Sequence, residues 1–87
     1  MKQKELQKMI EAGVVDTITF FRPLKVDGSI ISDWEIWAEG IPGDNVVRLS
    51  GNQLLTERGD VKTYSSLDRA FSAVRALGWT RKVEVDG

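Results

Sequence analysis

The spacing of apolar positions along the chain changes between two periods, and each period predicts a different kind of element. Near the N-terminus, apolar residues recur at helical spacing among polar ones, which predicts an amphipathic helix over residues 2–12 that ends at Gly13. A second stripe predicts a helix that begins at Ser65, whose hydroxyl caps the first turn, and ends at Gly78 before Trp79. The residues of this second stripe are Leu67, Ala70, Phe71, Val74 and Leu77.

Other segments alternate with the period of two that is typical of strands. Residues 14–24 are rich in β-branched and aromatic side chains and predict a first strand, and residues 30–39 predict a second. In the second strand Trp34, Ile36 and Ala38 share the face expected to be buried, opposite Asp33, Glu35, Trp37 and Glu39. Further strands are expected at residues 46–50, in a small hairpin of residues 54–57 and 61–64, and at residues 80–85, where Val83 and Val85 face inward.

This order of elements predicts one α+β domain over residues 1–87. An antiparallel β-meander is expected to carry the N-terminal and C-terminal helices on one face, with a final strand after the second helix. No apolar run approaches the ~20 residues of a membrane-spanning helix, and residues 1–5 lack the apolar stretch of a secretory signal. The sequence therefore favours a cytoplasmic protein that does not interact with a membrane.

Composition then restricts the chemistry. The chain has neither Cys nor His, which removes thiolate nucleophiles, the usual general base and the commonest metal ligands. No phosphate-binding loop with its lysine is present. We therefore expect a non-enzymatic binding module with no catalytic residues, no metal site and no cofactor.

The formal net charge of −1 conceals an uneven distribution. Residues 26–44 contain acids and no base, whereas residues 58–82 are rich in bases. Such a basic segment predicts weak, phosphate-directed binding of nucleic acid, with little sequence preference. The candidate nucleic-acid-binding residues are Arg58, Lys62, Arg69, Arg75, Arg81 and Lys82. Solvation of an ordinary surface is the alternative explanation of the same charges.

Two aromatic residues are expected on the sheet face opposite the core. Phe21 and Trp37 alternate with the core residues of their strands, so they predict an exposed apolar patch. The neighbouring acids would repel phosphates, which favours contact with protein and, in particular, a homodimer centred on Phe21 and Trp37. A protein–protein adaptor or homo-oligomeric module without a nucleic-acid role is the alternative to the nucleic-acid hypothesis.

Residues 54–70, followed by residues 74–79, carry a resemblance to a known family. A turn with the pattern L-x-T-x-R-G, Tyr64 before Ser66-Leu67-Asp68, an Ala-containing helix and a Val-rich final strand are similar to the C-terminal half of small plasmid-borne, partition-associated (ParC-like) proteins. The resemblance covers roughly residues 46–86, and the acidic, Trp-bearing strand departs from it. It implies an accessory role on a mobile element without enzymatic activity.

Overall fold

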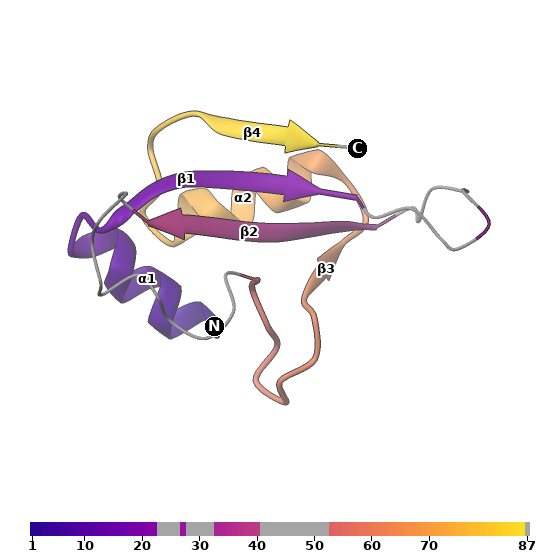
Figure 1. The fold of residues 1–87 in the computed structure, drawn as a ribbon, viewed down its shortest axis with the longest axis horizontal. Coiled ribbons are helices and arrows are strands. Elements are labelled where there is room, and N and C mark those ends of the chain that lie inside the picture. Colours follow the sequence, from indigo (N-terminus) through magenta and orange to yellow (C-terminus); the bar gives the residue numbers. More distant parts are fainter. Residues whose placement is uncertain (23–26, 28–32, 41–52, 87) are drawn as a thin grey trace.

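Four strands and two helices make up the computed structural model, which describes residues 1–22, 27, 33–40 and 53–86. Figure 1 shows them in chain order as α1 (Gln3–Glu11), β1 (Val15–Phe21), β2 (Trp34–Gly40), β3 (Thr63–Tyr64), α2 (Leu67–Ala76) and β4 (Val83–Asp86). The predicted strand at residues 46–50 lies outside the described residues, as do residues 23–24 of the first predicted strand and residues 30–32 of the second.

The strands form one mixed sheet in the order β3-β2-β1-β4. β2 pairs antiparallel with β1 and β3, and β4 pairs parallel with β1. The helix α2 crosses behind the sheet in Figure 1, between the two edge strands β3 and β4 that precede and follow it. The predicted α+β class and element order are therefore confirmed, and the parallel pairing of β4 makes the sheet mixed where a meander was expected.

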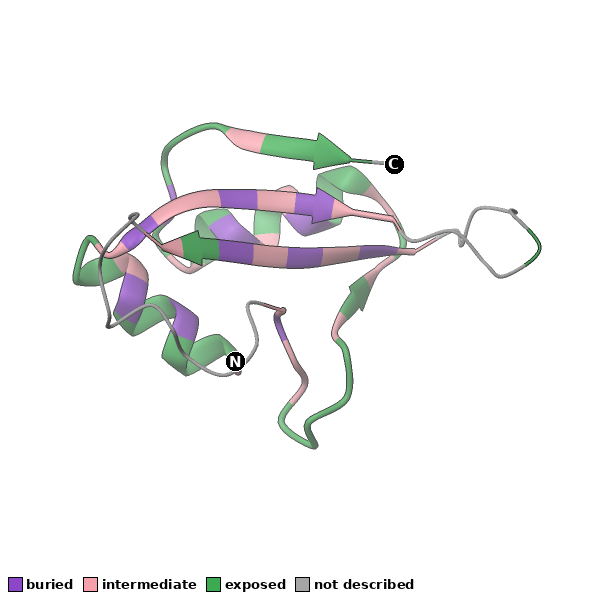
Figure 2. Cartoon of the chain, in the orientation of Figure 1, coloured by how far each residue is buried: buried purple, intermediate pink, exposed green. Residues whose placement is uncertain are grey.

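The core lies between the sheet and the two helices. Buried and half-buried residues alternate over residues 17–21 of β1 and 34–38 of β2 (Figure 2), as the period of two requires. Ile18 and Phe20 of β1 and Ile36 of β2 are at most 1% exposed. Leu6 and Met9 of α1 and Ala70 and Val74 of α2 are buried in the same cluster. The buried face predicted for Trp34, Ile36 and Ala38 is confirmed.

Both helix ends follow local chemistry. Gly13 and Gly78 adopt φ values of +73° and +99° after α1 and α2, a region that glycine tolerates without steric cost. After α2, the N–H of Gly78 donates to the carbonyl of Arg75 and that of Trp79 to the carbonyl of Val74, which is a Schellman motif. At the N-terminus of α2 the predicted cap is wrong by one residue, because Ser66 Oγ, not Ser65, accepts from the N–H of Arg69.

Two further sequence predictions concern the hairpin and the last strand. The hairpin around Gly59 is confirmed by an antiparallel bridge between Leu55 and Val61. Val83 and Val85 lie on the helix side of the sheet as predicted, in register with the core residues Ile18 and Phe20 of β1. Val85 is nevertheless 54% exposed, because β4 is an edge strand and nothing in the described residues packs beyond it.

Candidate binding surfaces

The sheet face opposite the helices, called here the outer face, carries the two aromatic residues expected there. Strand register places Phe21 beside Glu35 and Asp86, Thr19 beside Trp37 and Glu84, and Thr17 beside Glu39. Phe21 and Trp37 are both half-buried, and their rings meet edge to face with centroids 6.3 Å apart. The two predicted interface residues therefore form one aromatic pair on a face that neither described helix covers.

A hydrogen-bonded carboxylate fixes the orientation of Trp37. Glu35 Oε1 accepts from Trp37 Nε1 at 3.1 Å and from Gln53 Nε2 at 2.6 Å. Gln53 itself forms an antiparallel bridge with Trp37, so it is held beside the same ring. Because hydrogen bonds to an ionised acceptor are stronger than neutral ones, Glu35 holds the indole in one position on the surface.

The aromatic pair lines a shallow hollow of about 330 Å³, together with Thr19, Glu39 and Asp86. The ionisable residues that β1, β2 and β4 place on the outer face are Glu35, Glu39, Glu84 and Asp86. All of them are acids, so their fields add over the hollow. The outer face therefore combines a central aromatic pair with a rim of like-charged carboxylates.

The basic residues predicted to bind nucleic acid occupy three different places. Arg58 lies in the exposed turn of the hairpin. Lys62 and Arg69 line one open hollow beside β3 and the start of α2, and Asp33 and Asp68 line the same hollow. Carboxylates at that position oppose phosphate binding, since they share the space that a phosphate would enter.

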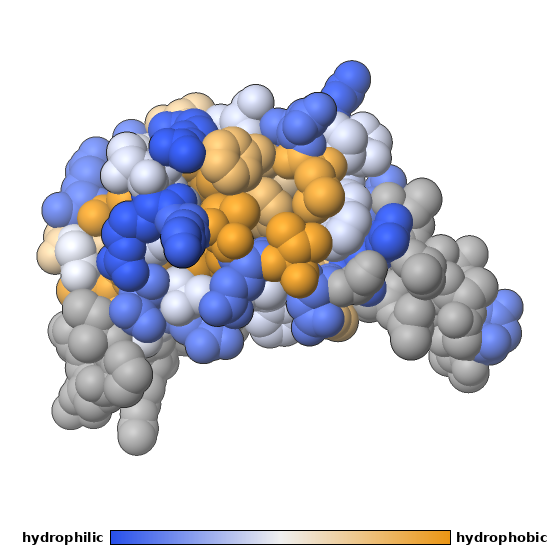
Figure 3. All heavy atoms as spheres, turned by 90° about the horizontal axis from the view of Figure 1, so that it is seen from above, coloured by the Kyte–Doolittle hydropathy of each residue, from blue (hydrophilic) through white to orange (hydrophobic). Residues whose placement is uncertain are grey.

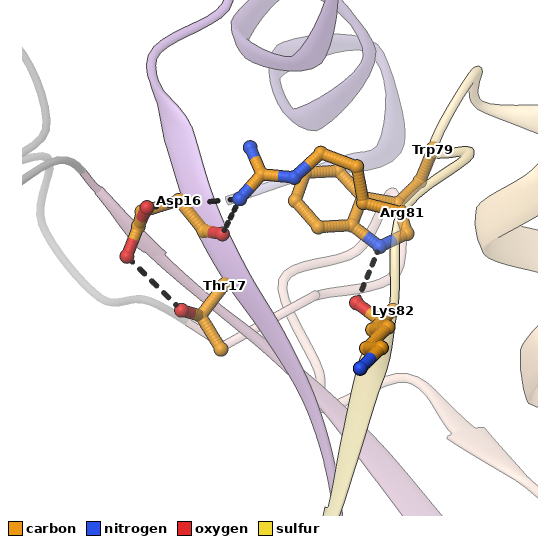
Figure 4. Close-up of polar contacts among 5 residues, drawn as sticks. All are labelled: Asp16, Thr17, Trp79, Arg81 and Lys82. Atoms are coloured by element: carbon orange, nitrogen blue, oxygen red, sulfur yellow. Dashed lines mark hydrogen bonds and ion pairs between the residues drawn. The ribbon is translucent and has the colours of Figure 1, made fainter.

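Arg75, Arg81 and Lys82 lie together at the end of α2 and the approach to β4. Arg81 stacks over the Trp79 ring at 5.0 Å, and its Nη2 donates to the Asp16 carbonyl at 2.8 Å and lies 3.7 Å from Asp16 Oδ1 (Figure 4). Asp16 sits where the β1–β2 register is irregular, which allows its side chain to turn toward Arg81. Arg81 is therefore already engaged by an acid and a carbonyl of its own chain.

Arg75 is engaged in a similar way. Its guanidinium stacks over the Phe71 ring at 4.7 Å, and Nη1 lies 3.4 Å from the Thr80 carbonyl that it donates to. The backbone carbonyl of Lys82 accepts from Trp79 Nε1 at 3.1 Å, whereas its side chain is exposed. The structure thus brings together Lys62 with Arg69, and Arg75 with Arg81 and Lys82, but not all six residues.

Sequence reasoning missed two contributors to these surfaces, Gln53 and Asp86, whereas it did place Glu35 on the face of Trp37. The hydrogen bond of Gln53 to Glu35 and the bridge of Gln53 with Trp37 depend on contact between segments far apart in the chain. The position of Asp86 beside Phe21 depends on the parallel pairing of β4, which alternation within β4 does not encode. Alternation did place Glu84 on the outer face, and the same alternation extended by two residues would have placed Asp86 on that face as well.

Comparison with known proteins adds no assignment: no protein-family model, curated protein or solved structure matches the chain. Within the described ranges, neither helix is long and apolar enough to cross a membrane. In the same ranges, His, Cys, Asp and Glu side chains form no group of three or more arranged to hold a metal ion.

Proposed function

We propose that this chain is a non-enzymatic protein-binding module that docks a basic segment of another protein on its outer face. One observation carries the proposal. The aromatic pair of Phe21 and Trp37 lies at the centre of a face whose ionisable residues on the described strands are all acids. An apolar centre with a polar, charged rim is the usual anatomy of a protein interface.

The chemistry of the face matches arginine and lysine side chains. A guanidinium or ammonium group is attracted to the face of an indole or phenyl ring, most strongly to that of tryptophan. Carboxylates at the rim, such as Glu39 and Asp86, accept hydrogen bonds from the same cations, and with arginine these can be bidentate. Glu35 holds the indole in place before a partner arrives, so less side-chain entropy is lost on binding.

Charge also distinguishes among the partners considered from the sequence. Nucleic acid would bring phosphates against the acids of this face, and a second copy in two-fold contact would bring those acids against their own counterparts. A basic protein segment meets neither repulsion. Phosphate binding by the basic residues is supported less well, because those residues are divided among three places and Arg81 is paired with Asp16.

An NMR titration tests the proposal directly. Uniformly ¹⁵N-labelled protein is titrated with a blocked peptide of alternating arginine and glycine, and the indole N–H resonances of Trp34, Trp37 and Trp79 are followed. We expect the Trp37 indole signal to move most, because that N–H bonds to Glu35 at the centre of the face, whereas Trp34 and Trp79 are buried. Raising the salt concentration should weaken the binding, since exposed charges are screened beyond ~10 Å at 0.1 M.

Matched controls separate this result from nonspecific attraction. A blocked glutamate–glycine peptide should leave the spectrum unchanged, and Glu39→Gln should weaken binding of the arginine peptide while Glu57→Gln, on the hairpin turn, should not. Duplex DNA and the protein alone at high concentration are the competing arms. Shifts at Arg69, Arg75 and Lys82 on adding DNA, or Trp37 shifts that grow with protein concentration without peptide, would replace the proposal with nucleic-acid binding or a homodimer.

A further inference from the structure

The edge of β4 leaves backbone hydrogen-bonding groups without a strand to pair with. β4 is the last strand in the sheet order, and in the described residues its far side pairs with nothing. The carbonyl of Asp86 accepts from the N–H of Arg22 at 3.0 Å, so Asp86 directs its backbone groups toward β1. Because these groups alternate along a strand, Val83 and Val85 direct their N–H and C=O groups away from the sheet.

An apolar shelf continues from this edge onto α2. Val85 is in register with Phe20, and the Phe20 ring meets the Phe71 ring edge to face at 6.3 Å. Leu67 lies one helical turn before Phe71 on the same side of α2 and is 37% exposed. Figure 3, which views the molecule from the side of β4, shows apolar atoms gathered at the centre of this face. Free backbone groups and exposed apolar side chains therefore lie side by side.

The charges on the two sides of β4 differ. On the outer face Glu84 and Asp86 are exposed carboxylates. On the helix side the guanidinium of Arg75 covers part of the Phe71 ring and borders the shelf. A strand added at this edge would therefore meet acids on one face and an apolar surface next to a cation on the other.

We infer that β4 accepts an extended segment of a partner protein as a fifth strand, and that this segment alternates apolar with basic side chains. Its apolar residues pack on Leu67, Phe71 and Val85, and its basic residues lie opposite Glu84 and Asp86. The main-chain hydrogen bonds of Val83 and Val85 supply affinity, and the alternating side chains supply specificity. This site shares Asp86 with the rim of the outer face but includes neither Phe21 nor Trp37, and it stands whether or not the outer face binds a partner.

The same charges oppose a second copy as the added strand. In a two-fold antiparallel pairing, Glu84 would lie opposite Glu84 of the other copy when Val83 pairs with Val85, and opposite Asp86 when Val85 pairs with Val85. Like charges directly opposite each other destabilise a strand pair. Lysine or arginine at those positions converts the same repulsion into attraction.

Peptides with selective backbone methylation test the inference. The probe is a blocked, labelled peptide of alternating valine and lysine, made in three forms: unmodified, N-methylated at every valine, and N-methylated at every lysine. Alternate residues of an added strand direct their N–H groups toward β4, so we expect one methylated form to lose at least about tenfold in affinity and the other to bind as the unmodified peptide does. Sensitivity at valine indicates antiparallel addition and sensitivity at lysine indicates parallel addition. Equal effects of the two methylation patterns would overturn strand addition.

Variants of the protein locate the site. Val85→Lys places a like charge on the edge and should weaken binding of the unmodified peptide about tenfold or more, and Glu84→Lys should do the same. Val61→Lys is the matched control, because Val61 is also an exposed valine but lies in the hairpin. Trp37→Ala should leave this binding unchanged while weakening binding of the arginine–glycine peptide to the outer face, so failure of one proposal is distinguishable from failure of the other. Unchanged binding by Val85→Lys, with its circular dichroism spectrum intact, would refute the β4 site.

Discussion

Truncating the two tryptophans of β2 should have very different effects on stability, although the residues are three apart in the chain. Trp34 is 7% exposed and belongs to the core cluster, whereas Trp37 is half-buried on the outer face. Removing a buried tryptophan leaves a cavity and costs about 3–5 kcal/mol of unfolding free energy. For a domain of this size, whose total stability falls near the low end of about 5–15 kcal/mol, Trp34→Ala should leave little folded protein.

The expected loss for Trp37→Ala is smaller and follows from its contacts. The edge-to-face contact with Phe21 contributes roughly 0.5–1.5 kcal/mol, and the hydrogen bond to Glu35 contributes a similar amount because it is partly exposed to solvent. Gln53 still donates to Glu35 in this variant, so the carboxylate keeps a partner. We expect a loss of about 1–2 kcal/mol and a folded protein.

Chemical denaturation with circular dichroism measures both variants against the wild-type protein. The two unfolding free energies should differ by about 2 kcal/mol or more, with similar dependence on denaturant concentration. Trp37→Phe serves as a conservative control that keeps a ring beside Phe21 and removes the indole N–H. A loss in Trp37→Ala as large as that in Trp34→Ala would mean that the outer face is buried in the free protein, and the docking proposal would lose its basis.

Three further predictions concern single residues. Ser66→Ala should cost about 1 kcal/mol of unfolding free energy by removing the cap of α2, and Ser65→Ala is a near-neutral control. Thermal unfolding should therefore show a lower melting temperature for Ser66→Ala than for Ser65→Ala. Gly78→Ala should cost roughly 1–2 kcal/mol, because φ is +99° and a residue with a Cβ is strained in that conformation. The added Cβ would not clash, because it would lie an ordinary 3.8 Å from the Ile10 side chain, so the loss measured by denaturant unfolding reports the backbone strain. Burial raises the pKa of Tyr64 above its ordinary value of 10.0, so the folded state holds that proton more tightly than the unfolded state does. The contribution of Tyr64 to the free energy of unfolding is therefore complete below pH 10.0 and is lost as the pH rises through the folded pKa. Ultraviolet absorbance of the single tyrosine measures its pKa, and Tyr64→Phe should remove this loss of stability at alkaline pH.

The environment of Tyr64 explains why the shift is upward. Its phenol oxygen is buried without a hydrogen-bond partner in the described residues, which disfavours the charged phenolate. The Gln3 side chain approaches the oxygen and opposes the shift without reaching hydrogen-bond geometry. A pKa at or below the ordinary value would show that water or Gln3 solvates the phenolate.

Periodicity predicted the helices and the faces of β1 and β2 because each of these signals is local. The stripe of α2 and the alternation in β2 are set by which side chains meet the core, and a strand slipped by one residue would bury the acids of β2. The predicted N-cap of α2 was wrong by one residue because Ser65 and Ser66 carry the same side chain, and the backbone geometry determines which of them caps the helix. Local signals are least able to separate such neighbours.

The pairing between strands far apart in the chain could not be predicted from the sequence. The parallel pairing of β4 with β1 follows from the path of the chain through α2, and this pairing brings Asp86 beside Phe21. The same limit applies to the basic residues between residues 58 and 82. They lie on a turn, on a helix and next to a strand, so the fold separates them into three groups. Charge counted along the chain therefore overstated how far those residues gather in space.

The alternation in β4 links the two proposed surfaces to the stability of the fold. Val83 and Val85 lie on the helix side in register with Ile18 and Phe20, and Glu84 and Asp86 consequently lie on the outer face. A slip of β4 by one residue would turn both acids to the helix side and remove Val83 from its contact with the core, which favours the observed register. The acidic character of the outer face beside Phe21, and the apolar shelf beside Phe71, are therefore set by the same constraint. A substitution that moved an acid of β4 to the other face would change what each surface binds and destabilise the sheet at the same time.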